Sequence, residues 1–188
     1  HYANAAADIE FKFPFGFKEL EGIHSRTDFD LSAHEKYSGR KLQYFDPERN
    51  ENYVPYVVET SVGLDRLFLS IFSHCLKDET LEDGSERTVL SLPPALAPVK
   101  AAILPLVKKD GLPEFAEKIF NDLKYDFNVI SEEKDSIGKR YRRQDAIGTP
   151  FCITVDHDSL ADGTVTLRER DTMKQERVKV EDLRRIID

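Results

Sequence analysis

The sequence has no apolar stretch of about 18 residues, which is the length that marks a candidate membrane-spanning helix. We therefore expect no transmembrane helix and no membrane association. The first residues, HYANAAADIEFKF, contain neither a basic segment nor an apolar core, so they do not form a signal peptide. They also lack an initiator methionine, and we interpret this start as a position inside a longer protein.

Cysteine is scarce. Only Cys75 and Cys152 occur, and neither has a second cysteine at a motif spacing. Such isolated cysteines are typical of reduced, buried thiols, and we predict a cytoplasmic protein. The histidines are scattered without metal-ligand spacing, so we predict no metal site in this chain. They include His24, His34, His74 and His157.

Positive charge is the scarcer sign. The chain has 27 lysines and arginines against 35 acidic residues, which gives a formal net charge of −8. Such a balance argues against broad binding of nucleic acid, although it still allows a local basic patch. The sequence also has no phosphate loop of the form G-x-x-x-x-G-K and no recoverable nucleophile–histidine–aspartate set. We therefore assign no catalytic side chain.

The pattern along the chain predicts two domains, 1–80 and 93–188. The apolar fraction of 40% is sufficient for packed cores. The first domain contains mostly strand patterns and one helix, and the segments around PERNEN predict an antiparallel hairpin. In the second domain, short apolar runs alternate with helical patterns, which predicts a mixed sheet covered by helices. We interpret the charged and proline-rich segment 81–92 as the linker.

The segment VPYVVETSVGLDRLFLSIF changes from a strand pattern to a helical pattern across Glu59 to Gly63. A helix N-terminus suits an anion, and a glycine lets a ligand approach the backbone closely. Arg66, just inside the helix, could stack on a base or bind phosphate. Equally, Ser61 could be an ordinary N-cap and Arg66 a solvated helix residue. The pattern alone leaves both interpretations open.

ETSVGLDR followed by an apolar helix resembles the third signature motif of class II aminoacyl-tRNA synthetases. The segments FPFGFKELEGIHSRTDFDL, HEKYSG, GKRYRRQDAIGTPFCITVD and TVTLRERDTMKQ together resemble the homodimeric type of glycyl-tRNA synthetase. This resemblance implies an α+β antiparallel-sheet tail of the catalytic domain, followed by an α/β anticodon-binding domain with a mixed five-stranded sheet. It also implies ATP and glycine as substrates, tRNA-Gly as partner, and Mg2+ and a homodimer in the complete enzyme.

The resemblance implies roles for individual positions. Glu59 and Ser61 would hold the amino acid, and the Glu59 carboxylate would fit the ammonium group of glycine. Arg66 would stack on the adenine of ATP. The implied ATP-binding residues are Glu19, Leu20, Gly63, Leu64, Asp65 and Arg66. The implied glycine-binding residues are Glu59, Thr60, Ser61, Val62 and Gly63.

Some residues in these segments have a structural alternative. Glu19, taken alone, could be a solvated strand residue. Arg26, Asp28 and Asp30 belong to the family stretch HSRTDFDL, and we expect them to stabilise structure rather than touch substrate.

The family also has a first motif that builds the dimer interface and a second motif whose arginine holds the α-phosphate. Neither occurs in this sequence, so we expect a C-terminal fragment that is inactive alone. The alternative is a stand-alone tRNA-binding or regulatory module without catalysis. The intact ETSVGLDR favours the ligase.

The segment GKRYRRQDAIG gathers four cations within five residues. On a helix they would form a dense positive surface, on which Tyr141 could stack on a base or simply anchor the helix. The alternative is a solvated basic helix balanced by nearby acids. Two further arginines share one strand face. The predicted tRNA-binding residues are Lys139, Arg140, Arg142, Arg143, Arg168 and Arg170. The sequence does not indicate which of them meets which anticodon base.

Overall fold

A computed structural model describes residues 2–188, and the chain divides into two units. Unit 1 ends at Ser73 and unit 2 is His74–Asp188. The predicted boundary, after residue 80, therefore lies too late. No helix in the described part of the chain is long and apolar enough to span a membrane.

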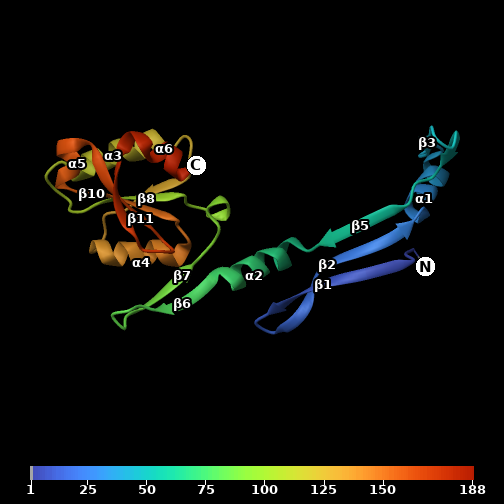
Figure 1. Cartoon of the computed structure of the whole chain (residues 1–188), viewed down its shortest axis with the longest axis horizontal. Coiled ribbons are helices and arrows are strands. Elements are labelled where there is room, and N and C mark those ends of the chain that lie inside the picture. Colours follow the sequence, from blue (N-terminus) through green and yellow to red (C-terminus); the bar gives the residue numbers. More distant parts are fainter. Residues whose placement is uncertain (1) are drawn as a thin grey trace. The chain divides into compact units, whose positions relative to one another are not determined.

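Unit 1 is built on a three-stranded antiparallel sheet in the order β1-β2-β5 (Figure 1). The predicted hairpin around PERNEN is confirmed as β3–β4. Helix α1 was not predicted. None of its residues is buried, so the segment has no apolar stripe that would mark it. The elements are β1 (Ala5–Phe13), β2 (Gly16–Thr27), α1 (Phe29–Ser38), β3 (Tyr44–Asp46), β4 (Glu51–Tyr53), β5 (Val57–Val62) and α2 (Leu64–Cys75).

Strand β2 is interrupted twice. Its register against β1 shifts so that Leu20 has no partner, and its register against β5 shifts between Ser25 and Thr27. Thr27 has a φ of 55°, which is unusual for a β-branched residue. Bulges of this kind bend a strand and redirect side chains, and they are common beside functional sites.

Unit 2 contains the predicted mixed five-stranded sheet, in the order β12-β11-β10-β8-β9. β8 pairs in parallel with β9 and β10, whereas β11 pairs antiparallel with β10 and β12. The elements are β6 (Leu76–Thr80), β7 (Glu86–Leu90), η1 (Pro94–Leu96), β8 (Ala101–Pro105), α3 (Leu112–Leu123), β9 (Val129–Ser131), α4 (Ile137–Ile147), β10 (Phe151–Val155), α5 (His157–Asp162), β11 (Thr164–Glu169), β12 (Gln175–Lys179), η2 (Val180–Asp182) and α6 (Leu183–Ile187).

Helices cover both faces of this sheet. Figure 1 shows α3, α5 and α6 on one face and α4 on the other. The alternation of side chains along each strand supplies a core to each face. In β8, Ile103 joins the larger core with α3 and α6, whereas Ala102 and Leu104 join a smaller core with Tyr141 of α4. The central strands consequently have continuous apolar sequences.

The segment interpreted as a linker is mostly a hairpin. Strands β6 and β7 pair antiparallel, and β7 packs against α4. Val89 is fully buried, and the Arg87 side chain is only 2% exposed. Residues 81–92 therefore do not form a free linker, because β7 packs against α4 within unit 2. We did not predict this hairpin, because the sequence KDETLEDGSERT is mostly charged and lacks the apolar alternation of a strand.

Candidate functional sites

The glutamate and serine of the E-x-S step lie inside strand β5 and not in a loop. Glu59 pairs in register with His24 and Ser61 pairs with Gly22. Because side chains alternate along a strand, Glu59 and Ser61 point to the same face of the sheet, whereas Thr60 and Val62 point to the other. Helix α2 begins only at Leu64, so Ser61 is not its N-cap.

The Glu59 carboxylate is held by an arginine. Arg26 Nη1 lies 2.8 Å from Glu59 Oε2, and Arg26 Nη2 donates a hydrogen bond of 2.7 Å to Asp30 Oδ1. The hydrogen bond from Arg26 lowers the pKa of Asp30 below its usual value. A small polar pocket is lined by Arg26, Asp30, Val57 and Glu59. Arg26 was expected to stabilise structure, and its contact with Glu59 was not foreseen.

Arg66 and Glu19, which are far apart in the sequence, meet at the end of the sheet. Arg66 Nη1 donates a hydrogen bond of 2.6 Å to the backbone carbonyl of Glu19. Glu19 stands beside the bulge at Leu20. The structure thus brings together Glu19 and Arg66, two of the residues implied to bind ATP.

Gly63 connects β5 to α2. Its φ is not positive, and a Cβ there would make only ordinary contacts of 3.7–3.8 Å with the Arg66 side chain. Contacts within the chain therefore do not require glycine at this position. Leu64 and Asp65 occupy the exposed first turn of α2.

In unit 2, the expected surface of four cations on α4 is wrong for Arg140. This side chain is buried, and its Nη1 donates hydrogen bonds to the carbonyls of Pro105 (2.7 Å) and Glu132 (3.1 Å). Burial lowers its pKa. Arg140 therefore fastens α4 to the end of β8 and the loop after β9.

The two arginines expected on one exposed strand face are also buried. Arg168 is paired with Asp145 through Nη1 (2.8 Å) and Nη2 (3.0 Å). Arg170 donates to the carbonyls of Gly148 and Leu92, at 2.7 Å each. Both arginines contribute to the interior of unit 2, and the spacing of charges in the sequence did not show their buried partners.

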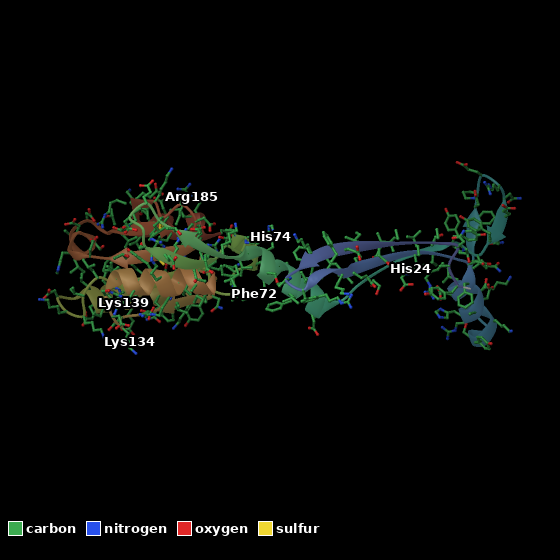
Figure 2. The ribbon with its side chains drawn as sticks, turned by 90° about the horizontal axis from the view of Figure 1, so that it is seen from below. His24, Phe72, His74, Lys134, Lys139 and Arg185 are labelled. Carbon is green, nitrogen blue, oxygen red and sulfur yellow. The ribbon has the colours of Figure 1, made fainter. Side chains whose placement is uncertain are left out.

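Three cations of α4 remain accessible. Lys139 is exposed, and the side chains of Arg142 and Arg143 are each 40% exposed. Figure 2 places Lys139 and Lys134 on the α4 side of unit 2. Arg143 is partly neutralised by Glu132 and by Asp135, the latter at 2.9 Å. Hydrogen bonding to Glu132 and Asp135 raises its pKa.

These cations border a cavity of about 580 Å³ between α4 and the turn that joins β11 to β12. Tyr141 forms part of its wall, and the ring is fixed at two points. Its hydroxyl shares a hydrogen bond of 2.6 Å with Thr154 Oγ1, and the Arg168 guanidinium lies 4.8 Å from the ring centroid. The cavity is lined by Gly138, Lys139, Tyr141, Arg142, Arg143, Arg168, Met173 and Gln175.

The cysteines and the possible metal ligands add no further site. Cys75 and Cys152 are buried free thiols, as predicted, and burial raises the pKa of Cys152 to about 12. Among residues 2–188, no group of three or more histidine, cysteine or acidic side chains is placed to hold a metal ion.

Comparison with known proteins gives matches in both units. Residues 100–188 match the family model described as "Anticodon binding domain". The chain is 57% identical over 180 residues to glycine–tRNA ligase of Chlorobaculum tepidum, a match that covers 96% of this chain and 38% of that protein. It is 56% identical to the Clostridium perfringens enzyme, covering 100% and 40%. The chain thus spans about two-fifths of the length of these relatives.

Solved structures show the same fold at low sequence identity. The RNA-binding domain of threonyl-tRNA synthetase from Cryptosporidium parvum matches with a TM-score of 0.69 and 21% identity, over 97% of this chain and 42% of that one. Prolyl-tRNA synthetase of Giardia lamblia, in complex with prolyl-adenylate, matches with a TM-score of 0.61 and 20% identity, over 97% and 36%.

Proposed function

Because this chain belongs to the glycine–tRNA ligase family and contains an anticodon-binding domain, we propose that it carries two working parts of such an enzyme. Unit 1 supplies residues that hold glycine and ATP during activation. Unit 2 binds the anticodon loop of tRNA-Gly. The complete enzyme would be a cytoplasmic homodimer that uses Mg2+ together with ATP.

In the proposed glycine site, Glu59 and Ser61 face the ligand together. One Glu59 oxygen is paired with Arg26 at 2.8 Å, and the side chain is 38% exposed, so its other oxygen can accept a hydrogen bond from the ammonium group. Ser61, on the same face, adds a second acceptor. Glycine has no side chain to recognise, so its charged groups must carry the binding. Thr60 and Val62 would contribute through the backbone only.

In the proposed ATP site, the observation that carries the assignment is the contact of Arg66 with Glu19. It places a planar cation, a bulged strand and the helix start of α2 at one end of the sheet. The guanidinium is exposed and can stack on a base. Gly63, for which the chain itself has no steric need, leaves room for the nucleotide beside Leu64 and Asp65. Activation of a carboxylate by ATP depends mainly on such positioning and charge neutralisation.

The complete enzyme that carries this chain is expected to catalyse ATP–pyrophosphate exchange that depends on glycine. Alanine and serine should support little exchange, because a pocket closed around the α-carbon of glycine would exclude even a methyl group. Exchange is measured with each amino acid at saturating ATP. If no amino acid supports exchange while tRNA still binds, a tRNA-binding or regulatory module without catalysis replaces this proposal.

In unit 2, we place the RNA contacts at the cavity beside α4. Lys139, Arg142 and Arg143 supply accessible positive charge, and Tyr141, whose ring lies beneath the Arg168 guanidinium, supplies an aromatic wall of the cavity for an unpaired base. Unpaired loop bases are recognised by stacking and edge hydrogen bonds. Arg140, Arg168 and Arg170 would support this surface from the interior rather than touch RNA.

Changing Lys139 and Arg142 together to glutamine should weaken binding of the tRNA-Gly anticodon stem–loop and flatten its salt dependence. Each lost phosphate contact lowers the slope of log affinity against log salt by about 0.7 to 0.9. The matched control changes Lys118 and Arg185 to glutamine. Both are exposed, and Figure 2 shows Arg185 on the opposite side of unit 2 from Lys139. Equal slopes for the two double variants would remove α4 from the RNA interface.

A further inference from the structure

We propose that Arg87, on hairpin β6–β7, is a positioning residue for the RNA site of unit 2. It acts through Asp145 and Arg168 to hold the Tyr141 ring at the wall of the cavity. This inference rests on the proposed binding of an RNA loop by unit 2, and it assigns a function to a hairpin that lies outside the matched domain, residues 100–188.

The Arg87 guanidinium is fully engaged. Its Nε donates a hydrogen bond of 2.8 Å to Glu79, which ties it to the other strand of the hairpin. Its Nη1 donates to Asp145 Oδ2 (3.2 Å) and to the carbonyl of Arg170 (2.8 Å), and its Nη2 donates to the carbonyl of Asp171 (3.3 Å). One side chain therefore connects the hairpin, helix α4 and the turn after β11.

Asp145 connects Arg87 to Arg168. The Asp145 carboxylate is completely buried, and its two oxygens accept hydrogen bonds from the two terminal nitrogens of Arg168. A paired fork of this kind fixes the plane of the guanidinium as well as its position. Arg87 donates to the same oxygen, Oδ2, that accepts a hydrogen bond from Arg168 Nη2, so loss of Arg87 removes one of the donors that fix the position of the Asp145 carboxylate.

Arg168 in turn sets the orientation of Tyr141. Its guanidinium lies 4.8 Å from the ring centroid, and the ring lines the cavity together with Lys139, Arg142 and Gln175. A base can stack well only on a ring whose plane is already fixed, because otherwise binding must order the ring first. The hairpin thus determines how well the cavity accepts a base, although Arg87 itself is buried and cannot contact RNA.

The experiment is a double-mutant cycle in the full chain, with Arg87→Lys, Tyr141→Leu and the double variant. The readout is affinity for the tRNA-Gly anticodon stem–loop across a salt series. Arg87→Lys should weaken binding roughly 5- to 10-fold, which is part of the value of one stacked base, and leave the salt slope unchanged. In the Tyr141→Leu background the same change should have almost no effect, because the two residues act on one interaction.

Two further variants separate positioning from simple loss of stability. Leu123→Ala removes a buried side chain of α3 and destabilises unit 2 without touching the Arg87 contacts, so at a temperature where it is folded it should bind RNA normally. Glu79→Gln weakens only the contact between Arg87 and the other strand of the hairpin. It should weaken binding of the stem–loop about twofold.

Additive losses in the cycle would overturn the inference, and so would a loss in Leu123→Ala equal to that in Arg87→Lys. Failure of the wild-type chain to bind the stem–loop would instead overturn the proposed RNA-binding function itself.

Discussion

Replacing Asp145 with alanine is expected to lower the free energy of unfolding of unit 2 by about 3–5 kcal/mol, the cost of breaking a buried ion pair by removing one partner. The carboxylate is completely buried, and it accepts hydrogen bonds from Arg168 at 2.8 and 3.0 Å and from Arg87 at 3.2 Å. Arg142 lies on its outer side at 3.5 Å. Alanine would leave the buried Arg168 guanidinium without a charged partner and Arg87 with Glu79 alone.

Urea unfolding followed by circular dichroism measures this loss. The matched control is Asp182→Ala, which also removes a carboxylate from unit 2. Asp182 is 42% exposed and pairs with Arg185 at the surface, so its loss should change stability by less than about 1 kcal/mol. Similar effects of the two substitutions would show that the Asp145 cluster does not hold α4, β7 and β11 together.

The short apolar runs of unit 2 predicted its strands closely. The apolar run Phe151–Val155 forms β10, and the helical patterns that precede it form α3 and α4. β10 is mostly buried and α3 carries an apolar stripe, so burial determines their sequences, whereas the buried residues of α4 are Arg140, Gln144 and Asp145. Helix α1 was not predicted, because none of its residues is buried and its sequence therefore has no apolar stripe.

The sequence did not indicate which of the charged residues are buried. Arg140, Arg168 and Arg170 have the same spacing as solvated residues, but each is buried against carbonyls or a carboxylate supplied by distant segments. Hydrophobic periodicity contains no information about such partners. The hairpin with Arg87 was missed for the same reason, since its buried face is partly an ionic network.

In unit 1, the family motif located Glu59, Ser61 and Arg66, and the structure adds their neighbours. Arg26, which contacts Glu59, is the unpaired residue of the bulge between Ser25 and Thr27. No local pattern predicts a bulge at that point, because strand alternation before and after it looks regular. Regular alternation alone would place Arg26 on the same face as His24, the cross-strand partner of Glu59.

In the complete enzyme, Glu59→Gln should reduce the specificity constant for glycine about 10- to 150-fold, which corresponds to roughly 1.5–3 kcal/mol for a charge-assisted hydrogen bond. Glutamine keeps the shape of the side chain and removes the charge that faces the ammonium group. The loss should appear mainly in the KM for glycine, because the same contact is present before and during the reaction. The KM for ATP should change little, since Arg66 and Glu19 meet at a different part of the sheet.

The most direct test of this account is to measure the KM for glycine and the KM for ATP by pyrophosphate exchange in Glu59→Gln and in Arg66→Ala. The two variants serve as controls for each other, because each lies in unit 1 and each removes one charged side chain. The account predicts a crossed result, in which Glu59→Gln raises only the KM for glycine and Arg66→Ala raises only the KM for ATP. If both variants changed both constants equally, or if neither changed either, the assignment of a glycine site and an ATP site to unit 1 would be contradicted.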